Sequence, residues 1–395
     1  MEIIRMPVEL LNEIFMKLRA DGLLNLLPVA LVSRHFYRIV TPLTYQTIYI
    51  DISGCTYPHP HVEDHTPTKR PLSTLISRLS AGPAVLALVR NIHVFGRDGV
   101  HPGALELLIG WLPKLRQLSS FSWNCDGSFP PSLLTSLGQH WPKAHLDMRT
   151  SFSKCDIKKD WKVLRLAPNM LRSLHVCMPN YPYDRVGKEA RVAKSKLLWA
   201  LRSCPGLHSL TTYDPNVYRN NRGLGASEPW HDLKPEFLLP QLAELTIADR
   251  TFEVDDLLKW GAKGGWTKLI KITLWDDRLL YGFQGCEQSL RSISLLHTKA
   301  ENENALVSIC SRTIRLTELK IKTEESRLPF SALMICGPSL ETLAIHPHRD
   351  ALDNWINMQD VPLCLLQAIQ RLCPGLTNLA LNLRWPPDNP ASLQT

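Results

Sequence analysis

One pattern, Leu-x-x-Leu-x-apolar, recurs along most of this chain and constrains its fold more than any other feature of the sequence. The clear copies begin at Leu171, Leu242, Leu269, Leu290, Leu316, Leu340 and Leu376. Weaker copies lie at 89–94, 115–118, 146–148 and 207–210. The alternating apolar residues in each copy indicate a short β-strand with one buried face. Because such a strand cannot bury its leucines alone, each unit must pack against its neighbours in an array.

Helical segments separate the strands and complete the repeated unit. Predicted helices cover 104–108, 188–201, 254–260, 303–310 and 362–372. Before two of the strands, at 204–206 and 373–375, the sequence Cys-Pro-Gly ends the preceding helix. Most clear copies start 21 to 27 residues after the previous one, within the ~20–29 residues of a leucine-rich repeat. We therefore predict an α/β solenoid over 71–384, with a parallel concave sheet and convex helices, followed by a disordered tail at 385–395.

The first forty-odd residues follow a different, helical pattern. The apolar positions that recur after Pro7 are Leu10, Leu11, Ile14, Phe15 and Leu18. Those of a second run, which opens at Pro28, are Val29, Val32, Phe36 and Ile39. We expect Thr41-Pro42 to stop this second run. With a short turn between the two runs, the pattern predicts a compact group of three helices. A unit of about 45 residues cannot bury all of this apolar surface by itself, so we expect it to dock onto a partner.

Residues 6–18 (MPVELLNEIFMKL) and 31–45 (LVSRHFYRIVTPLTY) resemble an F-box. The resemblance covers roughly residues 2–48 and involves more than a dozen spaced positions, with Met6 in place of the first leucine of the family's Leu-Pro pair. It implies docking on the Skp-type adaptor of a cullin ubiquitin ligase. We assign this docking to Pro7, Leu10, Ile14, Leu18, Val32 and Phe36. The repeats that follow resemble the irregular leucine-rich-repeat region that often comes after an F-box.

Residues 49–70 are predicted to form a linker or hinge between the F-box at 1–48 and the repeats. The segment holds the densest set of potential metal ligands in the chain, namely Cys55, His59, His61, Asp64 and His65. Glu63 lies two positions before His65, whereas the inverted zinc motif places Glu directly before the second His. Three prolines in this segment also oppose the helix that such a motif needs. We therefore interpret the segment as a polar hinge loop without a metal.

Composition and the motifs that are missing argue against several function classes. The 45 basic and 37 acidic residues leave a net charge of +8, too weak for the basic stripe that a nucleic-acid duplex requires. No nucleotide-binding loop or nucleophile elbow occurs, so we expect neither an active site nor a cofactor. The ten cysteines form no Cys-x-x-Cys pair and are predicted to be reduced, mostly buried thiols. Without a signal peptide or a run of about 18 apolar residues, the chain is expected in the cytosol or nucleus, away from membranes.

The outward-facing positions of the strands flank the second leucine of each copy, and most hold small polar residues. In the copy at 115–118 they are predicted to be Gln117, Ser119 and Phe121. Aromatic and cationic residues that commonly anchor interfaces occur at Tyr213, Lys271, Trp275, Lys320, Lys322 and His346. We predict that these six bind a protein substrate, with Trp275 as the aromatic anchor and the lysines facing an acidic or phosphorylated segment. At each position, a merely solvated sheet face is the alternative.

The combined expectation is the substrate-recognition subunit of an SCF-type ubiquitin ligase, as the F-box resemblance implies. The adaptor would link the chain to the cullin, and the repeats would hold a protein substrate near the ubiquitin-loaded enzyme without chemistry of their own. Two alternatives stay open. One is an F-box scaffold that binds the adaptor without ubiquitination, and the other is a hydrolase whose cysteine or serine site follows no known spacing.

Overall fold

The computed structural model divides into two compact units, Met1–Leu174 and His175–Thr395. The described residues are 6–20, 26–52, 83–96, 102–125, 129–151, 169–178, 197–199, 201–213, 239–249, 252–298, 303–323, 329–347 and 363–381. The candidate metal ligands at 55–65 and the predicted tail at 385–395 lie outside these residues, as does most of the predicted helix at 188–201. Their predictions stay untested.

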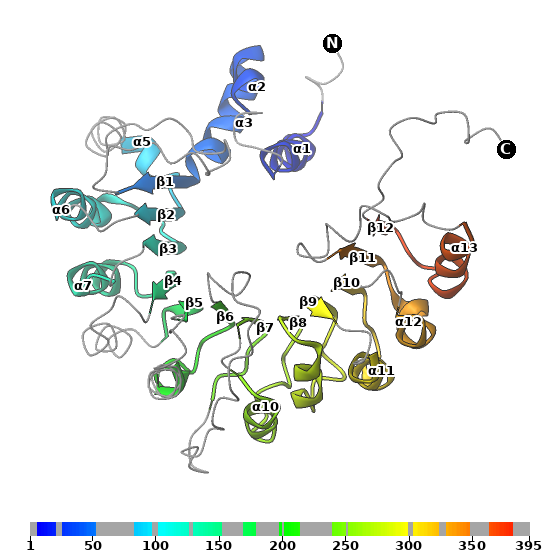
Figure 1. Cartoon of the computed structure of the whole chain (residues 1–395). Coiled ribbons are helices and arrows are strands. Elements are labelled where there is room, and N and C mark those ends of the chain that lie inside the picture. Colours follow the sequence, from blue (N-terminus) through cyan, green and yellow to red (C-terminus); the bar gives the residue numbers. More distant parts are fainter. Residues whose placement is uncertain are drawn as a thin grey trace. The chain divides into compact units, whose positions relative to one another are not determined.

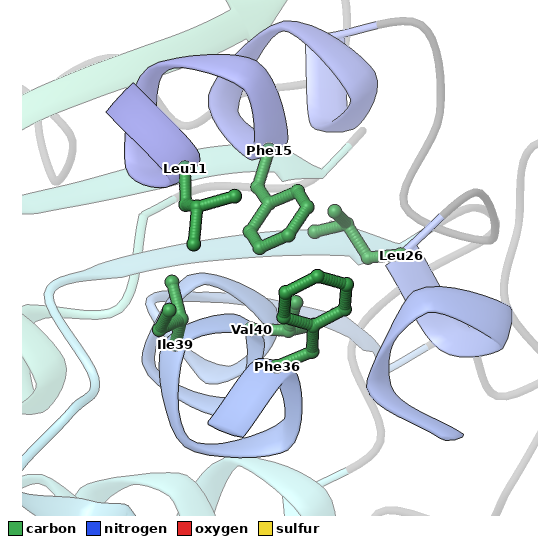
Figure 2. Close-up of a cluster of buried hydrophobic side chains, with 6 residues drawn as sticks. All are labelled: Leu11, Phe15, Leu26, Phe36, Ile39 and Val40. Carbon is green, nitrogen blue, oxygen red and sulfur yellow. The ribbon is translucent and has the colours of Figure 1, made fainter. Parts of the chain in front are cut away.

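The first unit begins with three helices, α1 (Val8–Ala20), α2 (Leu26–Val32) and α3 (Arg34–Tyr45). Their shared core is formed by Leu11, Phe15, Leu26, Phe36, Ile39 and Val40, which point toward one another in Figure 2. The rings of Phe15 and Phe36 meet edge to face, with their centroids 5.5 Å apart. The predicted group of three helices is therefore present.

The bounds of the second and third helices differ from the prediction. The expected stop at Thr41-Pro42 is wrong, because α3 continues through Pro42 to Tyr45. A proline near the end of a helix removes a single backbone hydrogen bond, and the next turn still closes through the bond from Gln46 N to Pro42 O. The break falls earlier instead, at Ser33, whose Oγ accepts a hydrogen bond from Phe36 N at 3.1 Å and so caps α3.

Strand β1 (Thr47–Asp51) follows α3 with only Gln46 between them. The predicted domain boundary at 48 and the linker beginning at 49 therefore cut through a strand. Both Arg90 N and Asn91 N donate to Gln46 O at 2.9 Å, which ties the start of β1 to the next strand. The alternation of Ile48, Ile50 and Ile52 indicates this strand, although it lacks the leading leucine of the repeat.

Three more strands complete the part of the sheet that lies wholly in the first unit: β2 (Asn91–Gly96), β3 (Ser120–Cys125) and β4 (His145–Ser151). The helices that follow β1 and alternate with these strands include α5 (Pro83–Leu86), α6 (Pro102–Trp111), η3 (Leu112–Lys114) and α7 (Pro131–His140). Figure 1 shows α6 and α7 on one side of β2–β4. The strands from β1 to β4 pair in parallel, each with its neighbour along the chain.

The register of β3 differs from the prediction for the copy at 115–118. The strand begins at Ser120, and Phe121 pairs with Ile92 while Trp123 pairs with Val94. Phe121 is fully buried, so its predicted outward position is wrong. The physical reason is that Leu115 closes the short helix η3 and does not start a strand. The repeat here is Leu118-x-x-Phe121-x-Trp123.

Strand β5 (Leu171–Cys177) spans the division between the units. The remaining strands belong to the second unit: β6 (Ser209–Tyr213), β7 (Glu244–Ala248), β8 (Lys271–Leu274), β9 (Ser292–Thr298), β10 (Glu318–Thr323), β11 (Thr342–Pro347) and β12 (Asn378–Leu381). From β6 to β12 each strand pairs in parallel with the next one along the chain. In the described residues the chain is thus an α/β protein with parallel strands in sequence order, as predicted.

The helices of the second unit lie on one side of its strands, as Figure 1 shows for β7–β12. They are α10 (Val254–Gly261), η5 (Asp277–Gly282), α11 (Glu303–Arg312), α12 (Phe330–Cys336), η7 (Gly337–Ser339) and α13 (Leu363–Leu372). The predicted helices at 254–260, 303–310 and 362–372 are confirmed. Between β8 and β9 the short helix η5 takes the place of an α-helix.

The cysteines that the structure describes match the prediction of buried, reduced thiols. Cys177 is half-buried, and the buried cysteines, none of which is in a disulfide, are Cys125, Cys204, Cys286, Cys310, Cys336 and Cys373. Among the described helices, none has both the length and the apolar character needed to cross a membrane.

Candidate functional site

The N-terminal helices expose several large apolar side chains to solvent. The exposed fractions are 49% for Leu10 and 42% for Ile14 on α1, and 86% for Leu31 and 67% for Val32 on α2. Leu10 and Ile14 lie one helical turn apart and so share one side of α1. We call these four residues the helix-surface patch. Leu31 was not among the predicted docking residues.

The six predicted docking residues do not share one surface. Pro7, Leu10, Ile14 and Val32 are exposed, but Phe36 is buried in the three-helix core and Leu18 packs against that core. Both are therefore corrected to structural residues. The reason is the helical period, because neighbouring residues such as Leu10 and Leu11 are separated by about 100° around the axis. The continuous apolar stripe seen in the sequence is two stripes, of which one holds the core and the other faces solvent.

Side-chain hydrogen bonds connect the helical group to the sheet of the first unit. Arg19 on α1 donates from Nη1 to Gln46 Oε1 at 2.7 Å and from Nη2 to Thr47 Oγ1 at 2.5 Å. Asn91 Nδ2 also donates to Thr47 Oγ1, and Ser120 Oγ donates to Asn91 Oδ1 at 2.8 Å. This chain of bonds runs from α1 across β1, β2 and β3. These bonds tie the helical group to the first strands of the sheet, and residues 53–70 of the predicted hinge lie outside the described residues.

The predicted substrate-binding residues lie on four separate strands of the second unit, β6, β8, β10 and β11, apart from Trp275, which directly follows β8. Lys322 pairs in register with His346, so these two side chains are neighbours. Lys271 pairs with Ser292, which in turn pairs with Glu318. Tyr213 pairs with Ala248 and is separated from β10 by three strands. The structure therefore groups Lys320, Lys322 and His346 and leaves Tyr213 apart.

Glu318 offsets part of the positive charge at this group. It forms an ion pair with Lys320 and accepts a hydrogen bond from the Ser292 hydroxyl. The hydrogen bond from Lys320 is the largest cause that lowers the pKa of the Glu318 carboxyl, and Ser292 adds to it. Lys320 is therefore already engaged within the sheet face, whereas Lys271 is exposed and Lys322 is half-buried.

The structure contradicts the prediction that Trp275 is an exposed anchor. Only 5% of Trp275 is exposed, and its ring stacks on His297, with the ring centroids 5.4 Å apart. Strand β9 holds one more residue than β10 between Leu295 and Thr298, as the register shift shows, and His297 lies in this irregular stretch. A large ring is costly to leave in water. His297 covers it, which single-strand reasoning could not foresee.

A second group of aromatic and polar side chains lies in register on one face of β1–β4, and sequence reasoning did not bring these residues together. Tyr49, His93, Ser122 and Asp147 pair in register across four strands. The ring of Tyr49 stacks on His93 at 5.1 Å and on Phe95 at 6.1 Å between centroids. We call Tyr49, His93, Phe95, Ser122 and Asp147 the stacked-ring patch. It was missed because β1 was not predicted and the register of β3 was shifted.

Desolvation changes the titration of two residues in the stacked-ring patch. Burial lowers the pKa of His93, which keeps the imidazole neutral at physiological pH. Burial raises the pKa of Asp147, and the nearby His145 opposes that rise only in part. Among the described residues, the charge of His145 therefore does not fully offset the burial of the Asp147 carboxylate.

Metal ligation and thiol chemistry depend on particular side-chain groups in the part of the chain that the structure describes. No three His, Cys, Asp or Glu side chains among these residues come together in a way that could hold a metal ion. Burial raises the pKa of the Cys204 and Cys286 thiols to about 12 each, so neither is a thiolate at neutral pH.

Comparison with protein-family models and with curated proteins finds no match to this chain. The helix-surface patch and the two exposed sheet faces are therefore the basis of any functional conclusion.

Proposed function

We propose that this chain is the substrate-recognition subunit of an SCF-type cullin ubiquitin ligase, acting in the cytosol or nucleus. The observation that carries the proposal is the helix-surface patch, in which Leu10, Ile14, Leu31 and Val32 stay exposed although the three helices have a complete core of their own. Large apolar side chains beside a satisfied core favour a protein partner. The F-box-like sequence of the same helices favours a Skp-type adaptor as that partner.

Adaptor binding would gain free energy from the burial of these side chains. Each fully buried leucine, isoleucine or valine contributes about 1.5–3 kcal/mol. A few such residues commonly dominate the affinity of an interface.

The exposed sheet face of the second unit is the proposed substrate surface. Trp275 is buried, and Tyr213 lies apart from the other predicted residues. The proposed substrate contacts therefore come from Lys271, Lys322 and His346, beside the Lys320–Glu318 ion pair. Lysine and histidine side chains on a face of small polar residues suit an acidic segment of a protein substrate. The chain would contribute proximity, and its partners would supply the transfer of ubiquitin.

The test measures binding of the full chain to a purified Skp-type adaptor. The variant Ile14→Ser/Leu31→Ser should lose at least about tenfold in affinity, because two apolar contacts are removed. Ile314→Ser is the matched control, because Ile314 is 60% exposed and lies in the second unit. Retained binding by the control and loss in the double variant are expected.

A wild-type chain that fails to bind the adaptor, or a folded double variant that binds as tightly as wild type, would contradict the proposal. Adding the cullin and the ubiquitin-transfer enzymes to the adaptor complex then tests the ligase role. A complex that excludes the cullin would favour the scaffold alternative.

A further inference from the structure

Three buried cysteines come from three successive repeats of the second unit. Cys310 lies in the last turn of α11, Cys336 is the last residue of α12, and Cys373 directly follows α13. Their exposed fractions are 1%, 3% and 2%. Because each cysteine stands at the end of the helix of its own repeat, the stacking of the repeats brings neighbouring thiols together.

The first two thiols are joined by a hydrogen bond where α11 packs against α12. The thiol of Cys310 donates to the sulfur of Cys336. This hydrogen bond is the largest cause that lowers the pKa of Cys336, although burial opposes it. The same hydrogen bond, together with burial, raises the pKa of Cys310. Cys336 is therefore the more nucleophilic sulfur of the pair, and Cys310 is the neighbour that keeps its proton.

Cys373 lies close to the other side of Cys336. A Cβ added to Gly337 would overlap Leu372 O and would lie 3.0 Å from Cys373 Sγ, so the backbone after Cys336 is held against the end of α13. Burial, followed by the charge of Cys336, raises the pKa of Cys373. The side-chain hydrogen bond of Cys336 goes to Cys310. The geometry therefore favours Cys310 over Cys373 as its partner.

Cys336 is buried, but it lies near the surface of the second unit. The two residues before it in α12, Met334 and Ile335, are 63% and 42% exposed. Helix α12 has only 7 residues, and the end of a short helix opens locally more easily than a long buried element. Hydrogen peroxide is little larger than a water molecule, so a small opening is sufficient to admit it.

We propose that Cys310 and Cys336 form a reversible disulfide when the chain meets hydrogen peroxide, and that this bond braces α11 against α12. Disulfides in cytosolic proteins are commonly transient and redox-sensing. The inference concerns the helices of the second unit. It goes beyond the proposed function and does not depend on it.

The reaction takes two steps. The Cys336 thiolate attacks one peroxide oxygen, the O–O bond breaks, and the leaving hydroxide takes up the proton released by Cys336 to become water. The Cys310 sulfur then attacks the sulfur of the Cys336 sulfenic acid, the S–O bond breaks, and the leaving hydroxide takes up the Cys310 proton as a second water. Two thiols are oxidised to one disulfide while one peroxide is reduced to two waters. Glutathione reverses the reaction by thiol–disulfide exchange.

The disulfide would close a loop that contains β10, because α11 precedes this strand and α12 follows it. A disulfide restricts the unfolded chain and so opposes opening of the segment that it closes. Strand β10 carries Lys320 and Lys322 on its outward face. Oxidation on the helical side of the repeats would therefore stiffen a strand of the exposed sheet face.

The experiment treats the folded full chain with hydrogen peroxide, blocks the remaining thiols with iodoacetamide and maps disulfides by mass spectrometry. The wild type should yield a peptide pair that joins Cys310 to Cys336, and glutathione should remove it. Backbone hydrogen exchange in β10 should become at least about tenfold slower after oxidation. Exchange in β7, which lies outside the closed loop, should stay unchanged.

Two variants and a control test the assigned residues. Cys310→Ala removes the hydrogen bond that favours the thiolate, so Cys336 should oxidise at least about threefold more slowly and without forming the bridge. Cys336→Ala removes the nucleophile, so Cys310 should stay reduced. Cys204→Ala is the matched control, because Cys204 is also fully buried and burial raises its pKa to about 12. Its loss should leave the bridge unchanged.

Circular dichroism establishes that each variant is folded, and the disulfide map of the wild type decides the question even where a variant is not. The proposal is overturned by a wild type in which both thiols stay free, by a bridge from Cys336 to Cys373, or by hydrogen exchange in β10 that oxidation leaves unchanged. Equal oxidation rates of Cys336 in the wild type and in a folded Cys310→Ala variant would also overturn it.

Discussion

Trp275 and Tyr49 are both aromatic residues at or beside the strands, yet only Tyr49 reaches solvent. The difference comes from the neighbouring strand, because His297 covers the ring of Trp275, whereas the rings of His93 and Phe95 leave 47% of Tyr49 exposed. Phe36 shows the same effect on a helix, where it completes the core and does not face a partner. At the scale of a residue, therefore, the neighbours decide between a packing role and a binding role.

Asp147 carries a prediction about pH and stability. Its pKa in the folded chain lies above the ordinary value of 3.8 because burial disfavours the charged form. The protonated Asp147 carboxyl therefore contributes its full stabilisation of the folded state below pH 3.8, and this stabilisation is lost as the pH rises through the raised pKa. Asp147→Asn should be more stable than wild type at neutral pH, and its advantage should shrink as the pH falls.

Urea unfolding of both proteins between about pH 7 and about pH 4 measures this difference. Glu244→Gln, at an exposed carboxylate, serves as the control. A variant less stable than wild type at neutral pH would show that Asp147 is stabilised by an interaction that outweighs its burial.

At the scale of elements, glycines in the segment from α10 to η5 leave room for the rings of neighbouring tryptophans. The rings of Trp260 and Trp266 lie 4.8 Å apart between centroids. Trp266 Nε1 donates to Leu257 O at 3.2 Å and to Gly282 O at 3.3 Å. The indole therefore bonds to backbone at the points where α10 and η5 approach each other. These contacts replace the packing that a full α-helix would provide in this repeat.

Gly265→Ala should destabilise the chain, because an added Cβ would overlap the ring of Trp260. Overpacking of a filled core typically costs about 1–3 kcal/mol. Gly138→Ala is the control, since Gly138 lies on the exposed side of α7 and a Cβ there meets nothing within 4 Å. It should stabilise the chain by about 0.5–1 kcal/mol, because alanine favours a helix more than glycine. Urea unfolding compares the two, and equal stabilities would contradict the assigned packing.

At the scale of the whole molecule, stability depends on contacts between successive strands and helices. Each strand from β6 to β12 pairs with its neighbours along the chain. A local defect should therefore spread to adjacent strands before it reaches distant ones. The division into two compact units predicts that such a defect stays within its own unit.

Leu343→Asp tests this behaviour. Leu343 is fully buried in β11, so an aspartate there would place an unpaired charge in the core. Backbone hydrogen exchange should become faster in β10, β11 and β12, whereas β1–β4 should keep their protection. Leu343→Met, which conserves volume, is the control. Uniformly faster exchange along the chain would mean that the two units unfold together.

The sequence alone was sufficient to determine the repeated strands, their parallel order and most of the helices. Local periodicity records which side of an element is buried, and in a parallel array of short units that information places each strand beside the next. The strand at Thr47–Asp51 was missed because it lacks the leading leucine, and the register of β3 was shifted because Leu115 belongs to a short helix.

Only the tertiary structure decided which side chains form surfaces. Leu10 and Leu11 are equivalent in the sequence pattern, and packing against α2 and α3 buries Leu11 alone. The alignment of Tyr49, His93, Ser122 and Asp147 depends on pairing between segments far apart in the chain. A shift of one residue in a strand would turn its side chains to the other face. Periodicity within a segment carries no information about that register, so the candidate sites required the assembled sheet.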